Sequence, residues 1–183
     1  MRGRSKALFN LSTVAMSVAL ITVCAWIYVP LPIGFTLQTF AIFLVSGCFP
    51  LGISLCSVLL YLCLGIIGIP VFSGFGGGFS AIVGPSGGFL IAFPVACLII
   101  ALFKKRYSQG IIYYIAAMTF AQTVCYVFGC IWYILVFSYP AGIGIGAALT
   151  VTVLPFIVTD ALKILLTSLV YKRLHSYLKR LPI

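Results

Sequence analysis

Only one residue in this chain of 183 is acidic, and that shortage of charge constrains the fold more than any other feature. Charged residues make up 7% of the sequence and apolar residues 63%. A soluble domain of this size needs many more charged side chains to cover its surface, so we expect lipid to be the solvent for most of the chain. The sequence therefore predicts an all-α integral membrane protein.

Breaks at Pro, Gly or charged residues divide the apolar sequence into six stretches. At about 20 residues for each crossing plus short connections, a chain of this length holds about six transmembrane helices. The predicted spans run from Ala7 to Val29, Phe35 to Phe49, Leu51 to Ile69, Phe89 to Phe103, Ile111 to Phe137 and Pro155 to Tyr171. The second and fourth are short. No room is left for a separate soluble domain, so we predict that residues 1–183 form a single transmembrane domain.

The Lys and Arg residues predict how the chain is oriented in the membrane. Ten of the eleven fall in three clusters, which precede the first span, follow the fourth and follow the sixth. The clusters are Arg2, Arg4 and Lys6; Lys104, Lys105 and Arg106; and Lys172, Arg173, Lys179 and Arg180. Six crossings put all three on one side, and cytoplasmic connections retain Lys and Arg. We therefore predict N-in and C-in termini, and we attribute the formal charge of +10 to membrane topology and not to nucleic-acid binding.

The remaining cation, Lys163, lies three residues after the only acidic residue, Asp160, inside the sixth predicted span. Residues at i and i+3 share a helical face, so the two side chains can pair. A charge in hydrocarbon is costly, and an ionisable residue inside a span is therefore a functional hypothesis. If the helix begins near Pro155, the pair lies toward the outer face and forms a site reached from outside. The alternative is a structural ion pair that holds helices together.

Other polar residues within the predicted spans can contribute to the same site. They are Thr36, Gln38 and Thr39 at the head of the second span, Gln122 and Tyr126 in the fifth, and Thr159 in the sixth. Gln38 offers both a donor and an acceptor to a neutral group such as a urea or an amide. Taken singly, each of these residues is more often an interhelical hydrogen bond than a ligand contact.

The sequence GFGGGFSAIVGPSGG, at residues 74–88, is the glycine-rich loop of this chain. It lacks the Lys and Ser/Thr of a phosphate-binding loop, and the chain contains no Walker A sequence with which to couple ATP hydrolysis to transport. Irregular backbone near a membrane is tolerated where it packs against protein or lines a watery cavity. The loop is predicted to be a lid or a wall of a pocket, with a merely flexible connection as the alternative.

The other chemistry-bearing residues give no sign of catalysis or metal binding. The seven cysteines form no CxxC pair and have no His at metal-ligand spacing, so we predict neither a metal nor a cofactor. One acidic residue and one distant His provide no set of nucleophile, base and orienting group, so we do not expect an enzyme. Ala15 and Ala19 make an AxxxA spacing that lets another helix approach closely, for which packing inside the bundle is the ordinary explanation.

Four blocks of the sequence, in order along nearly the whole chain, resemble one family. They are PIGFTLQT at 32–39, GIPVFSGFGGG at 68–78, GPSGGFL at 84–90 and LPFIVTDALK at 154–163. The family is BioY, the biotin-specific S components of energy-coupling factor (ECF) transporters. Ser86 and Phe89 stand where that family commonly has Thr and Tyr, and Thr159 where it often has Gly.

The resemblance implies a six-helix S-component bundle in the cell membrane that captures biotin from outside with high affinity. Biotin is then the transported ligand. The expected partners are a transmembrane T component and two cytoplasmic ABC ATPases, which supply the energy for transport.

The resemblance also implies roles for particular residues. Asp160 and Lys163 match a DxxK motif, and Thr36 and Gln38 match a TxQ motif, both of which are expected to contact biotin. The residues expected to close the pocket are Phe75, Gly76, Gly77 and Gly78. Ala15 and Ala19 match the small-residue motif proposed to dock the T component.

Other functions stay open on the residues alone. An S component for another vitamin would keep the topology and change the pocket. A stand-alone secondary carrier or channel would use Asp160 and Lys163 as a proton or ion relay. Which end of biotin meets which member of the pair is a further open question.

Overall fold

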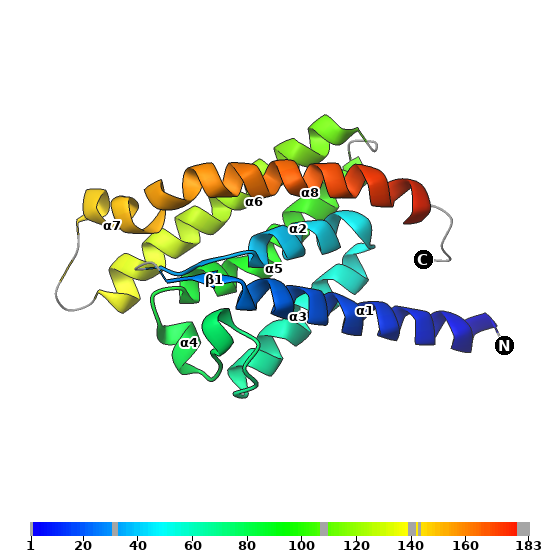
Figure 1. The fold of residues 1–183 in the computed structure, drawn as a ribbon, viewed down its shortest axis with the longest axis horizontal. Coiled ribbons are helices and arrows are strands. Elements are labelled where there is room, and N and C mark those ends of the chain that lie inside the picture. Colours follow the sequence, from blue (N-terminus) through cyan, green and yellow to red (C-terminus); the bar gives the residue numbers. More distant parts are fainter. Residues whose placement is uncertain (1, 31–32, 107–109, 139–141, 143, 179–183) are drawn as a thin grey trace.

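The computed structural model describes residues 2–30, 33–106, 110–138, 142 and 144–178 (Figure 1). Pro32, Lys179 and Arg180, which the sequence analysis used, lie outside these residues. Each of the six predicted spans overlaps one α-helix. These helices are α1 (Arg2–Trp26), α2 (Gln38–Cys48), α3 (Leu51–Ile66), α5 (Gly87–Arg106), α6 (Ile111–Trp132) and α8 (Ile157–Leu178).

The connections contain shorter helical elements that the sequence analysis did not predict. They are α4 (Ser80–Val83), α7 (Ile145–Thr152), 3₁₀ turns at Ser73–Phe75 and Leu154–Phe156, and a π-helical turn at Tyr133–Phe137. The glycine-rich loop is therefore partly helical, because α4 lies within it and α5 begins at Gly87.

Four helical segments of the described chain are long and apolar enough to cross a membrane. They are Lys6–Trp26, Gly87–Arg106, Ile111–Phe137 and Ile145–Leu174. The prediction that the fourth span is short was wrong, since α5 has 20 residues. Helices α2 and α3 have 11 and 16 residues, which extend about 16 and 24 Å at 1.5 Å per residue. Both are shorter than the hydrocarbon core of about 30 Å.

A two-stranded ribbon separates α1 from α2. Strand β1 (Tyr28–Val29) pairs antiparallel with β2 (Phe35–Thr36), with Tyr28 opposite Thr36. Pro30 disfavours a helical conformation in the residue before it, so the first helix ends earlier than the predicted Val29. The second helix likewise begins later than predicted. Thr36 is in a strand, and not at the head of a helix.

Helix α2 lies at the centre of the bundle. It packs against α8, α5 and α1, while α5 packs along α6 and α1 packs against α3. Nine of its 11 residues are buried. Gly47 allows the close approach of α6, since a Cβ atom there would lie 2.3 Å from the hydroxyl of Tyr114. That hydroxyl donates to the carbonyl of Phe43 at 2.6 Å.

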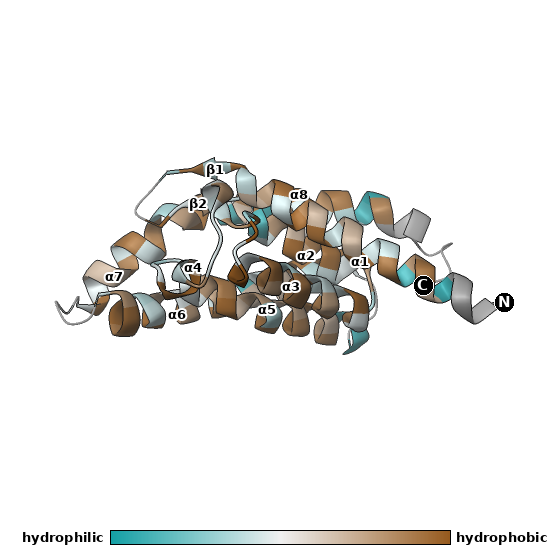
Figure 2. Ribbon diagram, turned by 90° about the horizontal axis from the view of Figure 1, so that it is seen from below, coloured by the Kyte–Doolittle hydropathy of each residue, from teal (hydrophilic) through white to brown (hydrophobic). Residues whose placement is uncertain are grey.

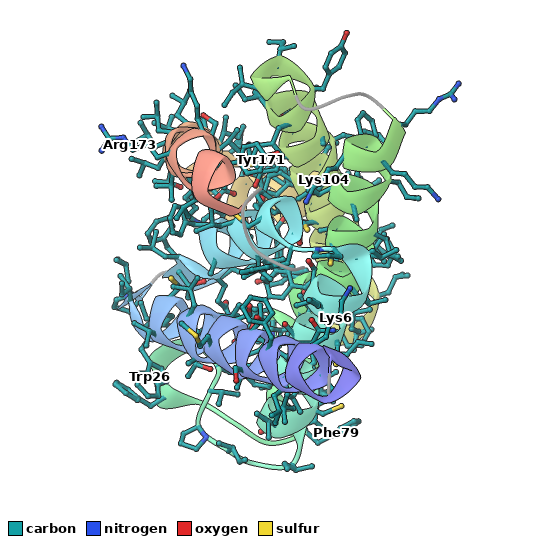
Figure 3. The ribbon with its side chains drawn as sticks, turned by 90° about the vertical axis from the view of Figure 1, so that its right-hand side faces the viewer. Lys6, Trp26, Phe79, Lys104, Tyr171 and Arg173 are labelled. Carbon is teal, nitrogen blue, oxygen red and sulfur yellow. The ribbon has the colours of Figure 1, made fainter. Side chains whose placement is uncertain are left out.

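Helix α1 begins and α8 ends at the same end of the bundle, which we call the cationic end (Figure 1). Figure 2 shows hydrophobic residues along the helices and hydrophilic residues toward this end. Lys6, Lys104 and Arg173 come to it from α1, α5 and α8 (Figure 3). Lys104 Nζ also donates to the carbonyl of Gly47 at 2.6 Å, which places a cation at the C-terminal end of α2.

Candidate functional site

Asp160 and Lys163 form an ion pair within the first two turns of α8. Asp160 Oδ1 lies 2.8 Å from Lys163 Nζ, and each residue is 5% exposed. The 3₁₀ turn Leu154–Phe156 leads into the helix, with Pro155 at a position that needs no intrahelical N–H donor. The predicted pairing on one helical face is therefore present, and the pair lies in the N-terminal half of α8, whose C-terminus is at the cationic end.

Two side chains of α6 complete the hydrogen bonding of Asp160. Gln122 Nε2 donates to Asp160 Oδ2 at 2.7 Å, and the Tyr126 hydroxyl donates to the same oxygen at 2.6 Å. Residues four apart share a helical face, so α6 presents both donors to α8 together. The carboxylate thus receives three donors, and charge-assisted bonds of this kind are among the stronger hydrogen bonds in proteins.

Lys163 has weaker partners than Asp160 apart from the ion pair. Its Nζ lies 3.4 Å from Thr39 Oγ1 of α2 and 4.2 Å from the centre of the Phe35 ring in β2. A lysine ammonium over an aromatic face gains a favourable cation–π interaction. The ammonium therefore connects α8 to both α2 and the ribbon.

Gln38 is the centre of a second polar cluster, at the first residue of α2. Its Oε1 accepts from Thr36 Oγ1 at 2.8 Å and from Ser73 Oγ at 3.3 Å. Its Nε2 donates to the hydroxyl of Tyr61, a fully buried residue of α3. Through its hydrogen bonds this amide therefore connects α2 with the ribbon, with α3 and with the segment just before the glycine-rich loop.

A cavity lies between these two polar clusters. The space between its lining atoms, with the open solvent at its mouth included, is about 530 Å³. Aromatic rings supply much of the apolar surface. The lining residues are Ile33, Gly34, Phe35, Thr36, Gln38, Thr39, Ser73, Ser86, Phe89, Leu90, Phe93, Gln122, Tyr126, Phe156, Asp160 and Lys163.

The structure brings together seven of the eight polar or charged residues that the sequence indicated for the site, and Thr159 is the one that does not line the cavity. The seven that line it are Thr36, Gln38, Thr39, Gln122, Tyr126, Asp160 and Lys163. Phe75, Gly76, Gly77 and Gly78 do not line it, although Ser73 from the adjoining 3₁₀ turn does. Ala15 and Ala19 are exposed on α1 and do not line the cavity either.

Two tryptophans hold the segment that carries the glycine-rich loop. Trp26 Nε1 donates to the carbonyl of Pro70 at 2.9 Å, and Trp132 Nε1 donates to that of Gly84 at 3.2 Å. The ring of Phe75 packs on Trp26 with centroids 4.9 Å apart, and its backbone has φ of 62°. This left-handed conformation is uncommon for a bulky residue, so the surrounding contacts hold the turn in place.

Sequence reasoning missed several groups at the site. Ser73 and Tyr61 both form hydrogen bonds with Gln38. Each is a single hydroxyl-bearing residue in an apolar or Gly-rich segment, and nothing else in those segments indicated a place at the site. The Phe35 ring beneath Lys163 had no signal, since aromatic residues are common throughout this chain. Gln122 and Tyr126 were not missed, and both line the cavity as the sequence predicted.

Comparison with known proteins identifies the family. The model of the BioY family matches residues 2–180 of this chain. The chain belongs to the BioY family. The resemblance seen in the four sequence blocks is thereby confirmed, and the BioY cavity contains residues from all four of them.

Relatives of this BioY chain match it over most of both lengths. The probable biotin transporter BioY of Pyrococcus horikoshii is 36% identical over 168 residues, which cover 91% of this chain and 96% of the relative. The biotin transporter BioY of Thermotoga maritima is 34% identical over 159 residues, which cover 86% of this chain and 90% of the relative. The crystal structure of the S-component for biotin from an ECF-type ABC transporter matches this BioY fold with a TM-score of 0.84 and 27% identity. The match covers 94% of this chain and 93% of the chain in that structure.

Proposed function

We propose that this chain captures biotin and transports it across the membrane as the S component of an ECF-type ABC importer. The observation that carries the proposal is the cavity around Asp160 and Lys163, which combines apolar walls with a few convergent polar groups. Membership of the BioY family supports biotin as the ligand, since the relatives compared above are biotin transporters and the matched structure is a biotin S component.

The chemistry of biotin suits such a cavity. Biotin has a neutral ureido ring, an apolar thioether ring and chain, and a carboxylate, so its site needs apolar walls and a few hydrogen-bonding groups. We assign the apolar contacts to the aromatic lining. We assign the polar contacts to Asp160, Lys163, Gln38 and Thr36, with Lys163 donating to an oxygen of biotin and Asp160 holding Lys163 in position.

The same proposal covers the topology. Residues 1–183 form one transmembrane substrate-binding domain that crosses the cell membrane six times, with both termini in the cytoplasm. The collection of Lys6, Lys104 and Arg173 at one end supports this orientation, because cytoplasmic connections retain cations. The short helices α2 and α3 complete the six crossings together with the irregular segments beside them.

Energy for transport must come from partners under this proposal. We infer that a transmembrane T component and two cytoplasmic ABC ATPases bind the chain, which itself captures biotin and catalyses no reaction. Ala15 and Ala19 support a docking surface on α1, because their side chains are exposed and small enough for a second helix to approach closely. Residues Phe75, Gly76, Gly77 and Gly78 are proposed to close over the ligand when it is bound.

Equilibrium binding by the purified chain in detergent, without partners, tests the proposal. We expect labelled biotin to bind with a one-to-one stoichiometry and to be displaced by unlabelled biotin but not by thiamine or riboflavin. Displacement by another vitamin in preference to biotin would assign the chain to that vitamin. Biotin uptake in cells that lack every ECF ATPase would instead indicate a stand-alone carrier.

A further inference from the structure

Gln122 has a buried hydrogen-bond acceptor with no donor in the part of the chain that the structure describes. The residue is 5% exposed and lines the cavity from α6. Its Nε2 donates to Asp160, whereas its Oε1 has no hydrogen-bond partner among the described residues. A buried polar atom without a partner costs free energy, so such an atom at a cavity wall indicates a partner that arrives with the ligand.

The orientation of the Gln122 amide follows from its neighbour. Ionised Asp160 can only accept hydrogen bonds, so the NH₂ group of Gln122 must face it. Reversing the amide would turn Oε1 toward a carboxylate oxygen and lose the 2.7 Å bond. Gln122 Oε1 is consequently held away from Asp160, and no donor among the described residues bonds to it.

The other glutamine of the cavity differs in this respect. Gln38 Oε1 already accepts from Thr36 and Ser73, and Gln38 Nε2 donates to Tyr61. The oxygen of Gln38 is therefore supplied with donors from the protein before any ligand binds. Gln38 can thus offer a ligand only its second amide hydrogen, as a donor, whereas the unused group of Gln122 is an acceptor.

Two further buried atoms of the described chain lack a partner, Asn10 Oδ1 and Thr152 Oγ1. Neither residue lines this cavity. Among the described lining residues, Gln122 alone thus combines a buried position with an acceptor that has no hydrogen-bond partner.

We propose that Gln122 Oε1 accepts a hydrogen bond from a ureido N–H group of biotin. This assignment rests on the proposed function, and it selects one end of the ligand. The carboxylate of biotin is ionised at neutral pH and the thioether has no hydrogen on sulfur, so the two ureido N–H groups are the only strong donors the molecule offers. Gln122 is then a specificity-determining residue that favours ligands with an N–H donor at this position.

The test compares two variants that remove the same support from Asp160. Gln122→Met and Tyr126→Phe each delete one donor to Asp160 Oδ2, but only the first deletes the Oε1 acceptor. The dissociation constants of biotin and of biotin methylated at either ureido nitrogen are measured for the unaltered chain and both variants. Methionine resembles glutamine in size, so the steric effect of the methyl group stays similar.

We expect the unaltered chain and Tyr126→Phe to bind one methylated isomer about tenfold more weakly than biotin, and Gln122→Met to lose most of that preference. Equal loss of biotin affinity in both variants, with the preference retained, would overturn the assignment and leave Gln122 as a support for Asp160. Failure of the unaltered chain to bind biotin would overturn the proposed function as well. Gln122→Leu replaces Gln122→Met if the latter does not unfold cooperatively.

Discussion

Removing either member of the buried ion pair destabilises the protein, but we predict unequal effects. After Lys163→Met, Asp160 keeps the donors from Gln122 and Tyr126 at 2.7 and 2.6 Å. After Asp160→Asn, Lys163 loses the negative charge of its partner and keeps only neutral groups: an amide oxygen in place of the carboxylate, a 3.4 Å contact with Thr39 and the face of a ring. The second change therefore leaves a buried cation with much poorer compensation than the buried anion left by the first.

The expected loss of unfolding free energy in each variant depends on the partners that the remaining charge keeps. Breaking a buried ion pair from one side costs about 3–5 kcal/mol, so we place Asp160→Asn in this range. We place Lys163→Met about 1–2 kcal/mol lower, because two charge-assisted hydrogen bonds still serve the carboxylate. The double variant carries no buried charge, and we expect it to be more stable than Asp160→Asn by about 1–2 kcal/mol.

The assay is unfolding of the four proteins in the same detergent, without ligand. The two tryptophans of the chain, Trp26 and Trp132, provide a fluorescence signal, since both bond to the segment that carries the glycine-rich loop. The predicted order of stability is unaltered chain, Lys163→Met, then Asp160→Asn, with partial recovery in the double variant. Equal losses in the two single variants that add up in the double variant would refute the reasoning.

Three other predictions concern the rest of the molecule. Lys104→Met removes the donor to the carbonyl of Gly47 and should lower the unfolding free energy by about 1–3 kcal/mol, measured in the same assay; an unchanged midpoint would contradict the capping role. Trp132→Phe removes the bond to Gly84 and should speed amide hydrogen exchange in the glycine-rich loop, whereas unchanged exchange would mean that packing alone holds it. Ala15→Leu should reduce ATP-dependent biotin uptake by vesicles containing the full importer while leaving the affinity of the isolated chain unaltered; full uptake would exclude this face of α1 as the docking surface.

The sequence allowed much of the helical framework to be predicted, because apolar stretches that end at Pro, Gly or charge have few alternatives in a membrane protein. It failed at the ends of those stretches. The β1–β2 ribbon depends on pairing between two-residue segments, and no periodicity is detectable over so short a length. Helix α2 begins at Gln38 and not at Phe35, because Phe35 and Thr36 pair with β1.

The candidate site was predictable where a signal lay within one helix and not where it depended on neighbouring elements. Asp160 and Lys163 were recognisable from their charge and their i, i+3 spacing. The approach of α6 to α8, which brings Gln122 to Asp160, depends on helix packing that a single sequence does not specify. Lys104 shows the same limit, since its place in a cationic cluster gave no sign of a bond to a residue 57 positions earlier.

The dissociation constant of biotin for Lys163→Met, measured beside Lys104→Met, tests most directly whether this cavity is the binding site. Both changes remove a lysine that bonds inside the bundle, one at the cavity and one at the cationic end. We predict that Lys163→Met weakens biotin binding tenfold or more, about 1.4 kcal/mol, and that Lys104→Met leaves it unaltered. Unaltered biotin affinity in folded Lys163→Met would contradict the account.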